Sequence, residues 1–250
     1  MIAIVTGASS GMGAEFCRAL DREGLDGIWL VARRAERLER VAAELKTPYL
    51  IFSTDLSTAE GLDVLRREIA DRDPDIRYLV NCAGFGRFGR SWEIPAGETR
   101  SMIDLNAGAL TEVTDMCIPH MAPGAGIIEL CSASAYISLE GLNVYAATKA
   151  YVRSYTNGLR AELKPMGINV LEVSPGWVDT DFIGLCRSEH DVPDRVFKHL
   201  LRKEDVVSKS MEALRRGKKR CVPGLFYRMQ VSMSMHFPNL AQRVWSGMMR

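Results

Sequence analysis

Short runs of apolar and β-branched residues alternate along this chain with longer segments of helical period. That alternation is typical of βαβ units, in which helices cover both faces of a parallel sheet. The predicted strands are Ile2–Thr6, Ile28–Ala32, Tyr49–Ser53, Tyr78–Asn81, Gly126–Ser132, Asn169–Ser174 and Arg220–Val222. The predicted helices are Gly13–Glu23, Arg34–Leu45, Ala59–Asp71, Glu98–Met121 and Tyr145–Lys164. The sequence therefore predicts an α/β fold built on a seven-stranded, doubly wound parallel sheet.

The 250 residues are 47% hydrophobic and 25% charged, as in globular proteins with one large core. No internal repeat, low-complexity tract or Pro/Gly-rich linker divides the chain. We expect one domain over residues 1–250. Two segments depart from the alternation, and we interpret them as a lid at about 181–204 and a C-terminal tail at about 223–250.

Charge and cysteine usage exclude several classes of protein. The formal net charge of +1 gives no reason to expect a nucleic-acid partner. The six cysteines lie singly, without a CxxC pair or a histidine at metal-ligand spacing, so we expect buried thiols and no metal: Cys17, Cys82, Cys117, Cys131, Cys186 and Cys221. Neither a signal peptide nor an apolar stretch of about 20 residues is found, which predicts a cytoplasmic protein.

A glycine-rich turn, Thr6–Gly13 (TGASSGMG), follows the first strand and opens a helix. Glycines permit a tight turn and let the backbone approach a pyrophosphate, while free N–H groups at the helix N-terminus attract its negative charge. Because the turn stands in the context that the motif requires, it predicts a nucleotide site.

Tyr145 and Lys149 lie four residues apart in a predicted helix, so both side chains share one face. An isolated tyrosine has a pKa near ~10, and a neighbouring ammonium lowers that value toward the range useful for proton transfer. The pair is a candidate general acid–base. Taken alone it is a weak indication, since Tyr-x-x-x-Lys occurs often by chance.

The TGxxxGxG spacing, Asp55 after the third strand and Asn81-Cys82-Ala83-Gly84 after the fourth are similar to the short-chain dehydrogenase/reductase (SDR) family. The resemblance runs from Ile2 to about Thr180, and it implies a Rossmann-type fold and a nicotinamide cofactor. The family usually shows N-N-A-G where this chain has Asn81-Cys82-Ala83-Gly84, so Cys82 is a mild departure, and Met12 in the glycine turn is another. Neither change removes a glycine.

The resemblance also implies a catalytic set. Tyr145 would transfer the proton, Lys149 would lower its pKa and bind the nicotinamide ribose, and Ser132 would polarise the substrate oxygen, with Ser134 as a less well-placed substitute. Asn106 would hold a water that leads from the lysine to solvent. The implied cofactor contacts are Gly7, Ser9, Ser10, Gly11, Met12, Gly13, Arg33, Asp55, Asn81, Ala83, Gly84, Tyr145, Lys149, Pro175, Gly176, Val178 and Thr180.

The end of the second strand indicates which cofactor is used. An NAD site places an acid there for the ribose 2′-hydroxyl, whereas a 2′-phosphate calls for arginine. Here the chain reads Leu30–Arg34 (LVARR), and we expect no acid in reach. A guanidinium forms charge-assisted hydrogen bonds with phosphate. We therefore expect NADP(H), with Arg33 as the main contact and Ser9 as a helper.

The substrate is expected to be a small-molecule carbonyl or alcohol. Phe85–Arg90, Ala135–Asn143 and the lid should line its pocket, with aromatic and apolar residues recurring in them: Phe85, Phe88, Tyr136, Leu139, Leu142, Phe182, Ile183 and Leu185. These residues suit a sterol, fatty acyl or aromatic ketone, although they could equally just pack the lid.

Alternatives to this activity stay open. A β-ketoacyl carrier-protein reductase resembles the chain up to the sixth strand but usually ends soon after the last one. A non-catalytic NADP(H)-sensing regulator would be expected to lose the tyrosine or the lysine. The longer epimerases and dehydratases with related folds differ in glycine spacing.

Two expectations concern partners. Glu98–Met121 and Tyr145–Lys164 correspond to the helices that pair across a two-fold axis in similar proteins, so we expect a homodimer or homotetramer. The basic run Arg215–Arg220 precedes a Met- and aromatic-rich tail, which fits contact with a membrane surface. Packing of the tail against the substrate side of its own subunit or a neighbour, which would hide those apolar residues, is the interpretation we favour.

Overall fold

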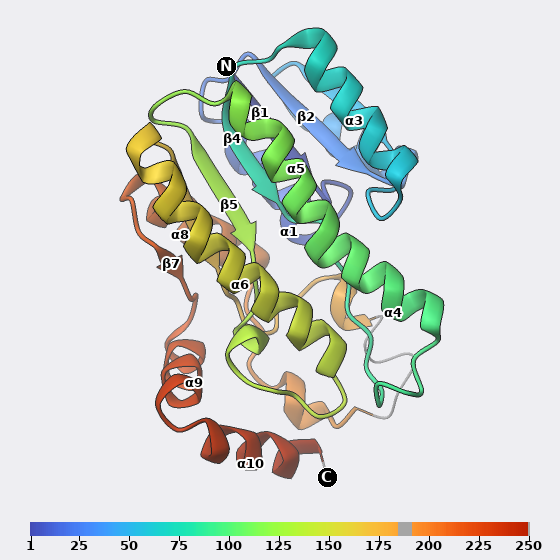
Figure 1. Cartoon of the computed structure of the whole chain (residues 1–250), viewed down its shortest axis with the longest axis vertical. Coiled ribbons are helices and arrows are strands. Elements are labelled where there is room, and N and C mark those ends of the chain that lie inside the picture. The colour runs from blue at the N-terminus through green and yellow to red at the C-terminus, as the bar shows by residue number, and fades with distance from the viewer. Residues whose placement is uncertain (185–191, 250) are drawn as a thin grey trace.

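The computed structural model describes residues 1–184 and 192–249 (Figure 1). Its seven strands form one sheet in the order β3-β2-β1-β4-β5-β6-β7, and every pair is parallel. Their bounds are β1 Ile2–Thr6, β2 Gly27–Ala32, β3 Tyr49–Ser53, β4 Ile76–Asn81, β5 Gly126–Leu130, β6 Asn169–Val173 and β7 Arg220–Cys221. The predicted doubly wound α/β sheet is confirmed. Because the order reverses between β1 and β4, the crevice at their carboxyl ends is where such sheets bind ligands.

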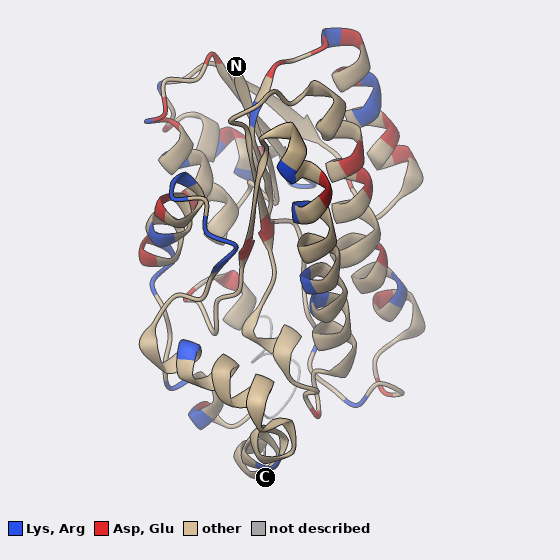
Figure 2. Cartoon of the chain, turned by 60° about the vertical axis from the view of Figure 1, so that its left-hand side comes forward, with Lys and Arg blue, Asp and Glu red and all other residues tan. Residues whose placement is uncertain are grey.

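Helices cover both faces of the sheet. One face packs on α1 (Gly11–Leu20), α2 (Ala35–Ala42) and α8 (Lys203–Arg215), and the other packs on α3 (Ala59–Arg72), α5 (Leu110–Cys117) and α6 (Asn143–Leu163). Lys, Arg, Asp and Glu lie mainly on these helices, with few in the sheet (Figure 2).

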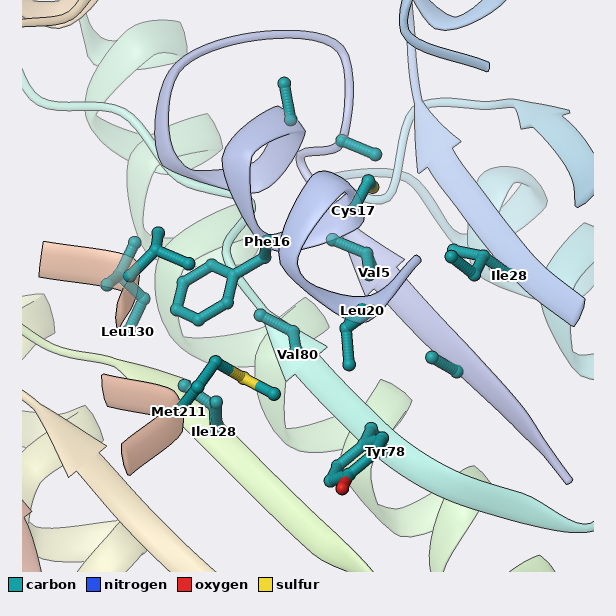
Figure 3. Close-up of a cluster of buried hydrophobic side chains, with 14 of the residues drawn as sticks. Val5, Phe16, Cys17, Leu20, Ile28, Tyr78, Val80, Ile128, Leu130 and Met211 are labelled. Atoms are coloured by element: carbon teal, nitrogen blue, oxygen red, sulfur yellow. The ribbon is translucent and has the colours of Figure 1, made fainter. Parts of the chain in front are cut away.

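Successive strand residues point to opposite faces, as the pleat requires. In β1, Val5 joins the core beneath α1, while Ile4 joins the core on the other face. Figure 3 shows Phe16 and Leu20 of α1 pointing toward the sheet, in the buried cluster that also contains Val5 and Val80. Strands buried on both faces explain why the sequence shows continuous apolar runs rather than alternation.

The predicted helix Glu98–Met121 is not a regular α-helix. It consists of α4 (Ala96–Ile103), a π-helical turn (Asp104–Ala109), α5, and a short 3₁₀ turn (Ile118–His120). π-turns are rare and are found frequently at functional sites. The turn here contains the predicted catalytic residue Asn106, a feature that apolar spacing alone does not reveal.

Two further differences concern the end of β5 and the helix that precedes β7. The strand predicted to run from Gly126 to Ser132 ends at Leu130, because the chain then turns into a 3₁₀ helix, η3 (Ala133–Tyr136). Helix α8 was not predicted at all. Its buried positions Val206, Val207, Ser210, Met211 and Leu214 follow helical spacing, so the sequence carried a pattern that could have found it.

The tail forms two helices, α9 (Leu225–His236) and α10 (Pro238–Met249), with one buried face and one exposed face. Tyr227, Val231, Ala241 and Trp245 are buried against the same chain, as the packing interpretation predicted. The opposite face exposes large apolar residues, which that interpretation did not predict: Leu225, Phe226, Met229, Met235, Phe237, Leu240 and Val244.

The described cysteines are all free thiols, and Cys17, Cys117, Cys131 and Cys221 are buried, while Cys186 lies outside the described residues. Burial raises the pKa of the Cys131 thiol to about 11 and that of Cys82 to about 12. Within residues 1–184 and 192–249 we find neither a helix long and apolar enough to cross a membrane nor a metal-binding cluster of His, Cys, Asp and Glu.

Candidate active site

A cavity of about 340 Å³ opens at the carboxyl ends of the central strands. Its wall comes from the glycine turn, the ends of β2, β4, β5 and β6, the start of α6, and the tail. Ser132, Tyr145 and Lys149 lie on this wall together with nearly all the residues predicted to contact the cofactor. Asn81 and Asn106 are the two predicted site residues that do not line it.

The conformation of the glycine turn depends on its three glycines, which have no side chains. Gly7 and Gly11 have φ of 68° and 56°, a left-handed conformation that favours glycine. A Cβ on Gly7 would stand 2.8 Å from the backbone nitrogen of Ala83, and a Cβ on Gly13 would collide with the carbonyl oxygen of Gly7. The chain thus forms a bare backbone cradle at the N-terminus of α1, which fits a pyrophosphate.

Thr6 joins this cradle to the end of β4. Its Oγ1 accepts hydrogen bonds from the backbone N–H groups of Cys82 and Ala83, both at 3.1 Å. Asn81, which precedes them, turns away from the cavity. Its amide donates to Thr114 and to Glu129, inside the core between β4, β5 and α5. The structure therefore places Asn81 behind the cavity wall rather than on it.

Arg33 does have an acid in reach, contrary to expectation. Its Nη1 lies 3.5 Å from Oδ2 of Asp55, which comes from the end of the neighbouring strand β3. Burial alone would raise the pKa of Asp55, but hydrogen bonds from Ser57 and the charge of Arg33 hold it below its usual range. The acid was missed because 22 positions of sequence separate two residues that the parallel pairing of β2 and β3 brings together.

Arg34 is the arginine that reaches the glycine turn. Its Nη2 donates to Ser9 Oγ at 3.3 Å and to Ser10 Oγ at 3.2 Å, and all three residues line the cavity. Sequence reasoning named Arg33 and left Arg34 out. The adjacent arginine in LVARR was the available indication. Both arginines therefore line the cavity at the end of β2, but only Arg34 is bonded to the two serine hydroxyls.

Lys149 is buried, and its Nζ donates to the carbonyl oxygen of Leu130 at 2.7 Å. Burial lowers the pKa of this amine. Nζ lies 5.8 Å from the centre of the Tyr145 ring, one helical turn earlier on α6. The predicted i, i+4 arrangement is thus formed, and the lysine is held in place by the end of β5.

Ser132 lies two residues beyond β5 and caps η3. Its Oγ accepts a hydrogen bond from the backbone N–H of Ser134 at 3.1 Å, which fixes the hydroxyl oxygen at the cavity wall. Ser134 lines the same cavity but is only 7% exposed.

Asn106 is fully buried in the π-turn. Its Oδ1 accepts from the backbone N–H of Phe85 at 3.0 Å, and its Nδ2 donates to the Phe85 carbonyl at 2.8 Å and to Thr148 at 3.1 Å. A Cβ on Gly84 would lie 2.9 Å from Asn106 Oδ1 and 3.6 Å from Lys149 Nζ. Because Gly84 has no side chain, Asn106 Oδ1 and Lys149 Nζ can both lie close to it.

The segment after β6 forms another part of the cavity wall. Pro175, Gly176, Val178 and Thr180 all line it. A Cβ on Gly11 would lie 3.3 Å from Cγ2 of Thr180, so this segment crosses close to the glycine turn.

The other end of the cavity is apolar and aromatic. Phe85, Leu139, Leu142 and Phe182 line it as expected, and Ile137 and Trp177 join them. Trp177 and Phe182 lie with their ring centres 6.5 Å apart. Of the other predicted pocket residues, Phe88, Tyr136 and Ile183 pack in the adjoining core instead, and Leu185 lies outside the described residues.

The tail also contributes to the wall, through Tyr227, Gln230 and Trp245. The ring of Tyr227 lies so close to Gly176 that a Cβ there would collide with it, and its hydroxyl donates to the carbonyl of His199 at 2.6 Å. Sequence reasoning favoured packing of the tail on the substrate side, but it did not single out these three residues as cavity lining, because their spacing predicts only a helix with an apolar face. These residues line the cavity only because α9 and α10 fold back onto the rest of the chain.

Comparison with known proteins agrees with this arrangement. The family model described as short chain dehydrogenase matches residues 1–190. Serine 3-dehydrogenase from Rhizobium radiobacter is 34% identical over 184 residues, which are 72% of each chain. Sulfoacetaldehyde reductase 2 from Chromohalobacter salexigens is 31% identical over 190 residues, covering 72% of this chain and 74% of that one.

Among solved structures, a short-chain dehydrogenase from Sphingobium yanoikuyae in complex with NADPH matches with a TM-score of 0.82 and 26% identity. It covers 100% of this chain and 96% of that one. The sequence and fold both lead to one assignment: this chain is a member of the short-chain dehydrogenase/reductase family, and it is an oxidoreductase with a Rossmann-type fold that binds a nicotinamide cofactor.

Proposed function

We propose that this protein is an NADP(H)-dependent oxidoreductase that interconverts a carbonyl group and an alcohol on an apolar substrate, with Tyr145 as the proton donor and acceptor. The observation that carries the proposal is the arrangement of Tyr145 and the buried Lys149 on the wall that also holds the glycine cradle. The chemistry of proton transfer and the cofactor site therefore share one cavity.

The preference for NADP(H) rests on charge. Arg33 and Arg34 both line the cavity at the end of β2, and Arg34 contacts Ser9 and Ser10. A 2′-phosphate there would accept hydrogen bonds from the guanidinium groups and from the two serine hydroxyls. Asp55 offsets part of the charge of Arg33, which makes Arg34 the stronger phosphate contact in this proposal.

When bound, the nicotinamide supplies a hydride to the carbonyl carbon or accepts one from the alcohol carbon. Ser132 Oγ donates a hydrogen bond to the substrate oxygen and stabilises the negative charge that develops on it. Tyr145 donates its hydroxyl proton to that oxygen in reduction and accepts a proton in oxidation. The Lys149 ammonium stabilises the phenolate by charge attraction. Asn106 holds the Phe85 segment beside Lys149, where a water can return the proton.

The apolar substrate class rests on the cavity lining. Phe182, Trp177, Leu139 and Leu142 offer apolar and aromatic surface next to Tyr145, and burial of such surface favours a hydrophobic ligand. The two curated relatives are named for small polar substrates, serine and sulfoacetaldehyde. Small polar carbonyl compounds and alcohols are accordingly the competing substrate class.

The test is a substrate panel followed by NADPH absorbance. It contains aromatic, steroidal and long-chain ketones with their alcohols, together with serine and sulfoacetaldehyde. We expect the apolar ketones to be reduced with the higher kcat/KM. Tyr145→Phe should still fold and bind NADPH but lose about 10²–10⁴-fold in turnover. Near-normal turnover by a folded Tyr145→Phe protein contradicts the mechanism, and preference for serine or sulfoacetaldehyde contradicts the substrate class.

A further inference from the structure

The apolar end of the cavity contains two polar side chains that the proposed mechanism does not use. Ser134 comes from η3, and Gln230 comes from α9, which packs against η3. Each has a buried oxygen, Ser134 Oγ and Gln230 Oε1, without a hydrogen-bond partner among the described residues. Buried polar atoms are nearly always paired in folded proteins, so two unpaired oxygens on one cavity wall require an explanation.

Ser134 lies two residues after Ser132, where the apolar end of the cavity adjoins the reacting groups. Its backbone N–H already holds Ser132 Oγ at 3.1 Å, so its side-chain hydroxyl is not needed for that purpose. The side chain is 7% exposed, and it borders the cavity. A structural role for the hydroxyl would show as a bond to a neighbouring side chain or carbonyl, and no such bond is found within the described chain.

Gln230 lies one helical turn after Tyr227, and the two residues reach the same cavity. The hydroxyl of Tyr227 has a structural role, since it donates a hydrogen bond to the His199 carbonyl at 2.6 Å. The Gln230 amide oxygen has no comparable partner in the part of the chain that the structure describes. It is therefore the acceptor that α9 leaves for a ligand.

The chemistry of the two oxygens selects the ligand group. An amide oxygen accepts hydrogen bonds, and a serine hydroxyl both accepts and donates. The ligand must therefore bring a donor. Four charged residues of the cavity wall, Arg33, Arg34, Asp55 and Lys149, belong to the cofactor and proton-transfer regions described above. The fifth, Asp181, is paired with Arg37 of α2 at 2.7 Å. A neutral hydroxyl thus fits better than an ammonium or a carboxylate, whose charge would be buried without a counter-ion.

We propose that Ser134 and Gln230 form a hydroxyl-binding subsite, so that the preferred substrate is an apolar ketone with a second, non-reacting hydroxyl group. This inference rests on the proposed function, because it assumes that the ketone occupies this cavity. A purely apolar ketone would bury both oxygens unpaired, whereas the hydroxy-ketone pairs them. One net hydrogen bond corresponds to roughly a tenfold preference.

The experiment uses pairs of methyl ketones of equal size, in which one member ends in a hydroxyl and the other in a methyl group. The pairs span aromatic and alkyl spacers of increasing length. For each ketone, kcat/KM is measured with NADPH, and the dissociation constant is measured by calorimetry on the NADPH complex. The proteins are the full chain, Gln230→Leu, Ser134→Ala and the control Gln242→Leu, whose residue lies on α10 and does not line this cavity.

For the best spacer we expect the full chain to favour the hydroxyl member by roughly tenfold or more in kcat/KM and in affinity. Gln230→Leu and Ser134→Ala should each reduce that ratio toward one, mainly by weakening the hydroxyl member, while Gln242→Leu should preserve it. The kcat/KM of each variant for the methyl-ended ketones shows whether it is folded and how well it reduces a ketone without the second hydroxyl.

The two proposals fail separately. If both members of every pair are reduced equally well by the full chain, the subsite is wrong and the reductase activity stands. If no ketone is reduced, but the hydroxyl member binds more tightly and loses that advantage in Gln230→Leu, the subsite stands and the proposed reaction is wrong. If neither member of any pair binds, the subsite is also overturned.

Discussion

The indole of Trp245 donates its Nε1–H to the carbonyl oxygen of Glu140 at 2.9 Å and thereby joins two segments 105 positions apart. Glu140 lies in the loop that leads into α6 and to Tyr145, while Trp245 belongs to the last helix. A third segment, the 3₁₀ turn Asp194–Phe197, also holds the last helix, since Nε of Arg195 donates to the carbonyl of Met248 at 2.8 Å. The tail thus fixes the loop that forms the apolar end of the cavity.

Trp245→Phe should therefore impair substrate binding more than cofactor binding. The substitution keeps a buried ring but removes one hydrogen bond, worth about 1 kcal/mol. We expect KM for an accepted ketone to rise several-fold, while the dissociation constant for NADPH stays within about twofold. Steady-state kinetics and calorimetry measure the two quantities. Trp92→Phe is the control, because Trp92 is 78% exposed. An unchanged KM in Trp245→Phe would show that the tail does not position the loop.

Lys149→Met should separate activity from stability. The variant keeps the length of the side chain but loses the ammonium and its bond to Leu130, so turnover should fall by at least ~10²-fold and NADPH should bind more weakly. Burial disfavours the charged form of Lys149 in the folded state, so loss of the ammonium should not lower the free energy of unfolding much. Single-turnover kinetics, calorimetry and denaturant unfolding test these points, with the exposed Lys164→Met as control. Full turnover in Lys149→Met contradicts the proposed role.

The two arginines at the end of β2 should contribute unequally to cofactor choice. Arg34→Ala removes the group that contacts Ser9 and Ser10, and it should weaken NADPH at least tenfold while changing NADH little. Arg33→Asp should also weaken NADPH, and it should improve NADH relative to it. The measurement is the ratio of dissociation constants for NADPH and NADH in each protein, with Arg40→Ala on the outer side of α2 as control. Tighter binding of NADH than of NADPH by the unmodified chain refutes the preference.

Glu129 should make stability depend on pH. It is fully buried, with Asn81 and Thr114 on one carboxylate oxygen and with the charges of Lys149 and Asp115 nearby. Burial raises its pKa from 4.5 to about 7. The folded state therefore binds more protons than the unfolded state between these values, and stability decreases as the pH rises through them.

Glu129→Gln removes this titration. We expect its free energy of unfolding to gain on the order of 3 kcal/mol relative to the unmodified chain between pH 4.5 and 8. Urea unfolding at several pH values measures the difference, and Glu112→Gln, on the exposed surface of α5, is the control. A constant difference between the two proteins over this range would show that Glu129 does not titrate there.

The face formed by α4, α5 and α6 should mediate self-association. Helices α5 and α4 run end to end through the π-helical turn, and α6 lies beside them (Figure 1). Ile103 of α4 and Tyr151 of α6 are exposed. We expect a dimer or tetramer by light scattering at micromolar concentration. Tyr151→Asp should shift the mass toward the monomer by placing like charges near a two-fold axis, whereas Tyr49→Asp, on the opposite edge strand, should not. A monomeric mass for the unmodified chain contradicts the prediction.

The sequence by itself determined the features that depend on neighbouring residues. Continuous apolar runs marked strands buried on both faces, glycines marked the cradle at Gly7 and Gly13 because only they avoid collision there, and a four-residue spacing placed Tyr145 one turn from Lys149. The resemblance then indicated which polar residues accompany them.

Tertiary structure alone decided which distant groups meet. Strand pairing brought Asp55 to Arg33, and the folded-back tail brought Gln230 and Trp245 to the cavity wall. Asn81 pointed into the core because Glu129 and Thr114 lie beside it there. Such contacts depend on the packing of whole helices and strands, whose relative positions no local pattern of residues specifies.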